Sequence, residues 1–182
     1  MISALPLRPD TAGDPLLTAA RLFLAVVIGL LLFAATFVTI GIGAILTVQR
    51  GEIFEKIAAA GAPTSAYPIV IVGFILVLAI LLLTARFLLE LRRMVDSVRQ
   101  GDPFRPENAD RLRLMGWIAV ATQLVWLVVV AIARWVDQFI EEGNGLPDTH
   151  LGSGLLLILV LFILARVFRV GSDMRDELEG TV

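Results

Sequence analysis

The sequence has no cysteine, a single histidine (His150) and few charged residues. The lack of cysteine excludes disulfides, thiolate metal sites, cysteine-bound iron–sulfur clusters and a cysteine nucleophile. The net charge of −2 gives no reason to expect binding to nucleic acid or to an acidic partner. Hydrophobic residues make up 58% of the 182 residues, and the mean hydropathy of +0.87 is too high for an ordinary soluble domain.

Four stretches contain no charged side chain, and each can be compared with the roughly 30 Å thickness of a bilayer's hydrocarbon core. They are Leu22–Val48, Ile69–Ala85, Leu114–Ala133 and Leu151–Ala165. The first is too long for the apolar part of a signal peptide, so we expect it to be retained. The sequence therefore predicts an all-α, polytopic membrane protein: one domain over residues 1–182, built as a bundle of four transmembrane helices after a flexible arm at 1–20.

The basic residues are distributed unequally between the two sides that these runs define. Twelve of the fifteen fall in the N-terminal arm, between the second and third runs, or after the fourth run, whereas Arg50, Lys56 and Arg134 fall on the other side. Cytoplasmic segments of membrane proteins carry the excess of Lys and Arg, so both termini are expected in the cytoplasm. Arginine outnumbers lysine fourteen to one, which is consistent with a GC-rich bacterial genome. In a bacterium, the four spans and the charge asymmetry predict a multi-pass protein of the inner membrane.

Helical periodicity continues beyond the second apolar run, because Phe87, Leu91 and Met94 keep one apolar stripe. A third helix is expected to begin near Pro106, so residues 86–113 are predicted to form a hairpin that extends into the cytoplasm. On the other side of the membrane, the segment Glu52–Ile57 reads as a short amphipathic piece, and Pro68 suits the first turn of the second helix. Gly171 and Ser172 are expected to break the last helix before a cytoplasmic tail at 171–182.

The predicted hairpin is the candidate partner-binding surface. Gly101 and Pro103 would shape its corner, and Phe104 would be exposed there. The surrounding arginines would make contacts with a partner, although orientation and contact with anionic lipid explain them better. The candidate binding residues are Arg99, Gly101, Pro103, Phe104, Arg111 and Arg113. Interspersed acidic residues argue against direct nucleic-acid binding, and Glu107–Arg111 and Asp110–Arg113 are predicted helical ion pairs.

Gln123 stands near the middle of the third apolar run, where an unsatisfied amide in hydrocarbon costs several kcal/mol. Thr36, Thr39 and Thr122 are its candidate partners in a hydrogen bond between helices. Alternatively, Thr36, Thr39 and Gln123 would line a path in a homo-oligomer acting as a small channel, exporter or immunity-type protein. No ionisable residue occurs in the middle of a run, which argues against a secondary transporter.

Enzyme and cofactor chemistry have little support in the sequence. The only metal candidates are Glu141, Glu142, Asp148 and His150 in the loop between the last two runs, and their spacing matches no metal motif, so a solvated loop explains them better. The serines lie apart from the histidine, and no glycine-rich phosphate loop follows a strand. We expect neither an enzyme nor a bound cofactor.

Two motifs carry a resemblance to a known family. They are Val98-Arg99-Gln100-Gly101-Asp102-Pro103-Phe104, with Glu107-Asn108 and Arg111-Leu112-Arg113 after it, and Val167-Phe168-Arg169-Val170-Gly171, with Met174, Glu177-Leu178-Glu179 and Thr181-Val182. Together they resemble the pattern of a bacterial four-helix membrane family, domain-of-unknown-function 2975. The genes of that family are often neighbours of small helix-turn-helix regulators of the phage-repressor type. The resemblance thus implies a non-enzymatic membrane accessory or sensor for a cytoplasmic regulator.

Overall fold

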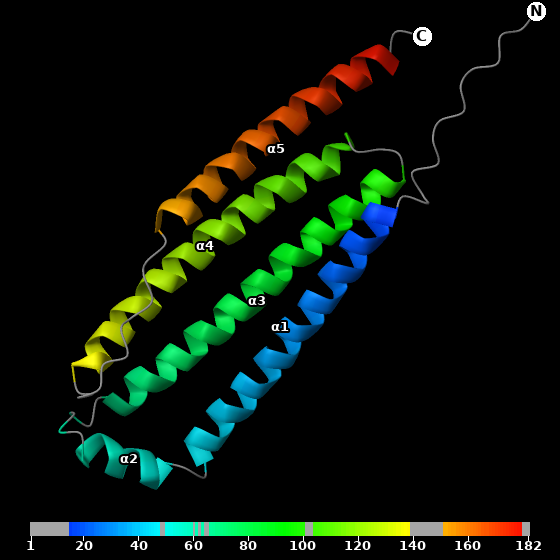
Figure 1. The fold of residues 1–182 in the computed structure, drawn as a ribbon. Helices are drawn as coiled ribbons and strands as arrows, with labels where there is room; N and C mark the ends of the chain where they lie inside the picture. Colours follow the sequence, from blue (N-terminus) through cyan, green and yellow to red (C-terminus); the bar gives the residue numbers. More distant parts are fainter. Residues whose placement is uncertain are drawn as a thin grey trace, which may run out of the picture.

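The computed structural model describes residues 15–47, 50–59, 61, 63, 66–100, 104–138 and 151–179, and the regular structure in them is helical throughout. The elements are α1 (Pro15–Thr47), α2 (Arg50–Ala59), α3 (Ala66–Arg99), α4 (Pro106–Asp137) and α5 (Leu151–Glu179) (Figure 1). By length and composition, α1, α3, α4 and the part Gly152–Glu177 of α5 are able to cross a membrane. The predicted all-helical, multi-pass membrane protein is therefore confirmed.

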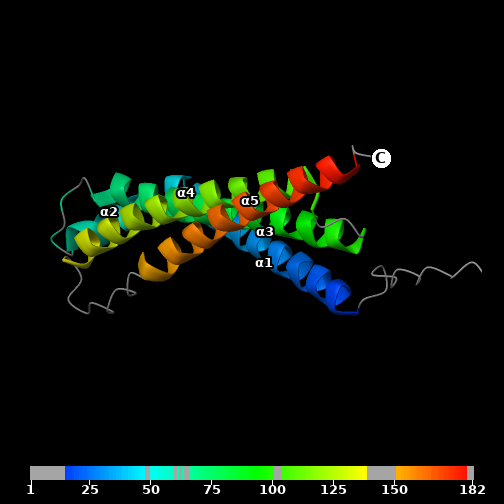
Figure 2. The same ribbon diagram turned by 90° about the horizontal axis from the view of Figure 1, so that it is seen from above.

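The four long helices lie side by side in the order α1, α3, α4, α5, and extensive contacts join only successive members of this row (Figure 1). The short α2 contacts α1 and α3 at one end. Seen from above, α1 and α5 are inclined to the central α3–α4 pair (Figure 2). A bundle of four helices was predicted, and the four helices do pack together, but they form an open layer. In hydrocarbon an apolar helix face loses little by staying uncovered, so the four faces need not converge on one core.

Several predicted helix boundaries are confirmed. α3 continues through the charged segment to Arg99, α4 begins at Pro106, α2 covers the amphipathic piece, and Pro68 is the third residue of α3. Two boundaries differ from the prediction. α1 begins at Pro15, inside the arm predicted over 1–20, since proline suits a first helical position. α5 continues through Gly171 to Glu179, although a break was predicted there.

Three polar contacts bring the start of α1, the α3–α4 connection and the last part of α5 to the same end of the layer, which we call the hairpin end. Arg21 pairs with Asp96, Ser97 bonds to Asn108, and Asp110 pairs with Arg169. The opposite end, where α2 lies, we call the α2 end. The chain thus returns to the hairpin end after each pair of long helices.

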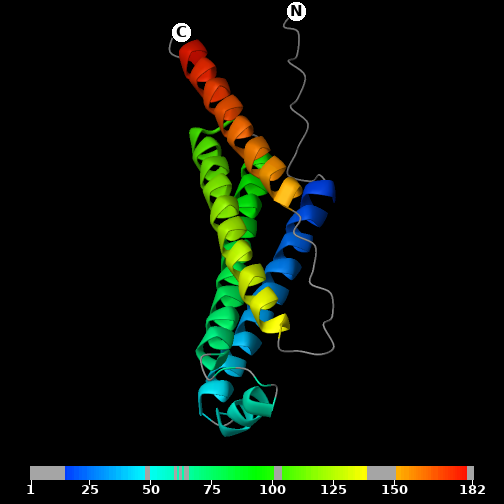
Figure 3. The same ribbon diagram turned by 90° about the vertical axis from the view of Figure 1, so that its left-hand side faces the viewer.

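The fifth helix is displaced along α4 toward the hairpin end (Figures 1 and 3). Because Gln123 lies against Gly154, the first residue of α5 is level with the middle of α4, near Trp126. Its last turns extend beyond the start of α4 (Figure 3). The helix therefore begins short of the α2 end. Its charge-free part is only about 22 Å long at 1.5 Å per residue.

Close packing holds α5 against α4. At three places a large side chain of one segment packs directly against a glycine of the other. Phe162 packs against Gly116, Gln123 against Gly154, and Phe104 against Gly171. Trp117 meets Phe162 edge-on at a centroid distance of 5.6 Å. Beside these contacts, Leu112, Met115 and Leu161 form a buried hydrophobic cluster. Small residues let helix axes approach closely in membranes, and here they fix the position of α5.

Candidate functional site at the hairpin end

A buried carboxylate lies between three arginines at the hairpin end. The side chain of Glu90 on α3 is only 2% exposed, and it accepts hydrogen bonds from Arg86 and from Arg93, the latter at 2.8 Å. Arg111 of α4 brings its Nε to 3.9 Å from the second carboxylate oxygen. The surrounding charge compensates the buried anion and links α3 to α4.

A second part of this network is centred on Asn108, which is fully buried. Its Nδ2 donates to Ser97 Oγ at 2.6 Å, and its Oδ1 accepts from Arg111 Nη1 at 2.9 Å. The Ser97 hydroxyl donates in turn to the Met94 carbonyl at 2.7 Å. Since buried polar groups are costly unless they are paired, this network fixes the register of α3 against α4.

The sequence analysis did not identify Glu90 as a site residue and gave Asn108 no role. For Glu90, the spacing of the neighbouring arginines could have indicated its ion pairs. Arg86, Glu90 and Arg93 lie four and three residues apart, which places both arginines beside one carboxylate on a helix. The predicted ion pairs of α4 were also replaced by contacts between helices. Arg111 pairs with Glu90 rather than with Glu107, and Asp110 pairs with Arg169 rather than with Arg113.

The structure distributes the candidate partner-binding residues among different environments. Arg111 belongs to the buried network, and only 29% of its side chain is exposed. Arg113 is exposed on α4, and Arg99 lines a polar groove with Arg21. Gly101 and Pro103 lie outside the described residues.

Phe104, which precedes α4, is half exposed and packs against α5. Its ring lies 5.4 Å from that of Phe168 and against Gly171, where a Cβ would approach Phe104 Cδ1 to 3.1 Å. This contact explains why glycine stands at 171 without interrupting the helix. It also joins the two sequence motifs, because Phe104 belongs to one motif and both Phe168 and Gly171 belong to the other.

An apolar groove of about 500 Å³, which we call the Phe104 groove, opens beside this contact. Its exposed apolar side chains are Phe104, Val167, Val170 and Met174, of which Val167 is 54% and Met174 56% exposed. Arg166 lies at one end of the groove. The groove therefore offers an apolar surface with one positive charge at its edge.

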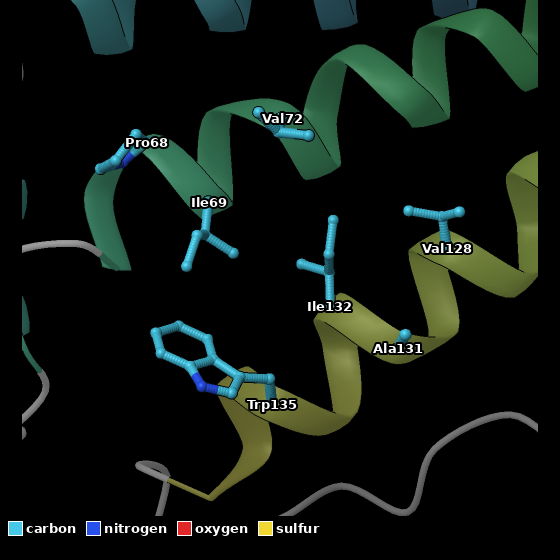
Figure 4. Close-up of a pocket in the computed structure, with 7 residues that line it drawn as sticks. All are labelled: Pro68, Ile69, Val72, Val128, Ala131, Ile132 and Trp135. Carbon is cyan, nitrogen blue, oxygen red and sulfur yellow. The ribbon is translucent and has the colours of Figure 1, made fainter.

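A second apolar groove, of about 410 Å³, lies between α3 and α4 near the α2 end (Figure 4). Ile69 and Val72 of α3 face Val128 and Ile132 of α4, and the indole of Trp135 lies beside Ile69 (Figure 4). Its lining is apolar apart from the indole nitrogen, and it lies among the membrane-spanning parts of both helices. Lipid chains cover such a surface, so the groove does not by itself indicate a ligand site.

The path residues predicted from the sequence, Thr36, Thr39 and Gln123, are not brought together within one copy of the chain. Thr36, Thr39 and Thr122 each donate their hydroxyl to the carbonyl four residues earlier in their own helix. α1, which carries Thr36 and Thr39, is separated by α3 from α4, which carries Gln123. Gln123 instead lies against Gly154 of α5. A path lined by all three predicted residues would thus require several copies of the chain.

The metal candidates Glu141, Glu142, Asp148 and His150 lie outside the described residues. Within residues 15–138 and 151–179, as far as these are described, no group of three His, Cys, Asp or Glu side chains is arranged to hold a metal ion.

Comparison with known proteins agrees with the two motifs that meet at the hairpin end. No curated protein and no solved structure matches the chain. A family model described as Protein of unknown function (DUF2975) matches residues 52–182, which include α3, α4, α5 and both motifs. Because this match covers more than half of the sequence, the chain belongs to the DUF2975 family.

Proposed function

We propose that this membrane protein is a non-enzymatic accessory that holds a soluble cytoplasmic partner in the Phe104 groove. The observation that carries the proposal is a set of exposed apolar side chains on the part of α5 that extends past the charge-free run. Met174 lies eight residues beyond Arg166, which is about 12 Å along the helix. Exposed apolar patches outside hydrocarbon generally mark contacts with proteins.

The distribution of charge supports a cytoplasmic location for the hairpin end. Among the described residues, Arg50, Lys56 and Arg134 belong to the α2 end, and the other basic residues belong to the hairpin end. These are Arg21, Arg86, Arg92, Arg93, Arg99, Arg105, Arg111, Arg113, Arg166, Arg169 and Arg175. Such an excess is typical of the cytoplasmic side of a bacterial inner-membrane protein.

The shape and charge of the Phe104 groove suit an amphipathic helix. Val167, Val170 and Met174 are three and four residues apart, so their side chains form one ridge along α5. A partner helix would lay its apolar face along that ridge and place an acidic side chain near Arg166. The partner class that the family resemblance suggests is a small helix-turn-helix regulator, which is helical and soluble.

The test compares two identical substitutions at the hairpin end. Val170→Asn changes the groove, whereas Val98→Asn changes an apolar residue of α3 outside it, and the two side chains are similarly exposed at 41% and 37%. A small helix-turn-helix regulator of the phage-repressor type is to be titrated against the purified full-length protein in nanodiscs. We expect Val170→Asn to weaken binding about tenfold or more and Val98→Asn to change it less than twofold, since polar groups in an interface core are costly.

These variants test the groove better than substitution of Phe104 or Arg111 would. Phe104 also packs on α5, and Arg111 also pairs with Glu90, so their loss would disturb the fold as well as the surface. Equal affinity of the wild type and Val170→Asn for the regulator would refute docking in this groove. No binding of the regulator to the wild type would remove the proposed partner.

A further inference from the structure

We propose that a groove between the start of α1 and the end of α3 binds the phosphate headgroup of an anionic phospholipid. This groove has a volume of about 350 Å³ and is lined by Arg21, Asp96, Arg99 and Gln100. It lies on the opposite side of α3 from α4 and α5, so it is separate from the Phe104 groove and does not depend on partner docking.

The charges of the groove suit a phosphodiester. Among the described residues that line it, two guanidinium groups and one carboxylate give a net charge of +1. Arg21 approaches Asp96 through its Nε, at 3.4 Å, and 45% of its side chain remains exposed. A guanidinium carries five N–H donors, so Arg21 is able to bind a second acceptor while its pair with Asp96 persists.

The level of the groove matches the surface of the membrane. Contacts between successive helices place Arg113 of α4 level with Arg166 of α5, and about level with Arg92 of α3. Both Arg113 and Arg166 border a charge-free run. Asp96 is four residues, or about 6 Å, farther toward the hairpin end than Arg92. The groove therefore lies in the headgroup layer, which is about 5–7 Å thick on each side of the hydrocarbon.

An apolar ridge begins next to Arg21 on α1. Immediately after Arg21, the side chains of Leu22, Val26 and Leu30 are 67%, 54% and 62% exposed. They are four residues apart and form one ridge on α1. Acyl chains of a lipid whose phosphate occupies the groove would cover this ridge. The groove and the ridge together suit a molecule that carries both a phosphate and acyl chains.

The experiment measures lipid binding to the full-length protein by native mass spectrometry in detergent micelles. Phosphatidylglycerol and phosphatidylcholine with the same acyl chains are the probes. We expect the wild type to bind phosphatidylglycerol more tightly, and Arg21→Gln combined with Arg99→Gln to weaken that binding about tenfold or more. Arg92→Gln combined with Arg113→Gln removes the same charge outside the groove, and this control is expected to change binding less than threefold.

A gain of affinity provides a readout that misfolding cannot imitate. Asp96→Asn removes the one negative charge of the groove, so binding of phosphatidylglycerol is expected to tighten severalfold. Equal losses in the two arginine double variants, or unchanged affinity in Asp96→Asn, would overturn the proposed site. Displacement of the lipid by glycerol phosphate at equal concentration would also overturn it, because the apolar ridge would then contribute nothing.

Discussion

A series of three glycine-to-alanine substitutions tests how α5 is held in place. Each position lies inside a helix, and each substitution brings the same gain in helix propensity, up to about 1 kcal/mol. The surroundings differ. A Cβ at Gly29 on α1 would meet nothing within 4 Å, whereas a Cβ at Gly116 on α4 would lie 3.1–3.2 Å from three ring atoms of Phe162. A Cβ at Gly154 on α5 would overlap Gln123 Oε1.

The expected magnitudes follow from what each neighbour is able to do. The ring of Phe162 is held edge-on by Trp117, so Gly116→Ala overpacks a fixed contact at a cost of about 1–3 kcal/mol. Gly29→Ala lacks that cost, and the free energies of unfolding of these two variants should differ by about the same 1–3 kcal/mol. Gly154→Ala should lie between them, because the flexible end of Gln123 moves aside more easily than a packed ring.

The assay is equilibrium unfolding in mixed micelles, followed by tryptophan fluorescence. Trp117 reports directly on the contact with Phe162, while the other tryptophans report on the rest of α4. A double variant, Gly154→Ala with Gln123→Ala, serves as a control, since removal of the amide should abolish the cost at Gly154. If Gly116→Ala stabilised the protein as much as Gly29→Ala, the described packing of α5 on α4 would be refuted.

Three further predictions concern the hairpin end and the topology. A double-mutant cycle with Asn108→Ala and Ser97→Ala should give a coupling energy of about 0.5–1.5 kcal/mol in the same unfolding assay, and additive effects would contradict the buried bond. Glu90→Gln should lower the free energy of unfolding by about 1–3 kcal/mol. This is less than the cost of breaking a fully buried ion pair, because the arginines around Glu90 are partly exposed. Added salt should make the destabilisation smaller. The chain has no cysteine, so a single introduced cysteine can report the topology. Glu107→Cys should react with a membrane-impermeant maleimide only from the cytoplasmic side, and Glu52→Cys only from the other side. The reverse pattern of labelling would show that the predicted topology is inverted.

The helix boundaries were predictable because they depend on local signals. The charge-free runs indicate the membrane spans, and Pro106 indicates the start of α4. The apolar stripe that includes Leu91 indicates that α3 continues beyond its charge-free run. Gly171 was misread for the same reason. A glycine in a sequence indicates a break or a close approach equally well, and only the position of Phe104 in space distinguishes the two.

The open layer and the displacement of α5 were not predictable from periodicity. A water-soluble helix reveals its core face because its other face is polar, but a membrane helix is apolar on all sides. The exposed side chains of α1, such as Phe33 and Phe37, are as apolar as its buried Leu24 and Ile28. The contacts that set the register are specific pairs, such as Gly116 with Phe162, and a single sequence does not indicate which residues pair.

The sequence predicted which region of the chain forms the candidate site, but not what each residue in it does. Phe104 and Arg111 were both expected to face a partner, because each follows the predicted corner. The structure separates them, since the Glu90 network binds Arg111 and the groove on α5 contains Phe104. The role of each residue depends on the helix that it contacts: Arg111 contacts α3, and Phe104 contacts α5. Because α3 and α5 pack on opposite sides of α4, the sequence alone does not show which residue contacts which helix.

The arrangement of α5 gives the proposed docking groove a physical link to the membrane. Extensive contacts hold α5 to α4 alone, so its position is set by one interface. A partner in the groove would contact Phe104 before α4 and Val170 on α5 at once, and its affinity would depend on the offset between these segments. By thermodynamic linkage, any change in the bilayer that shifts α5 along α4 would alter partner binding, and the bound partner would oppose that shift. A helix whose charge-free part is about 22 Å long is sensitive to such changes, because it is shorter than the roughly 30 Å of hydrocarbon around it.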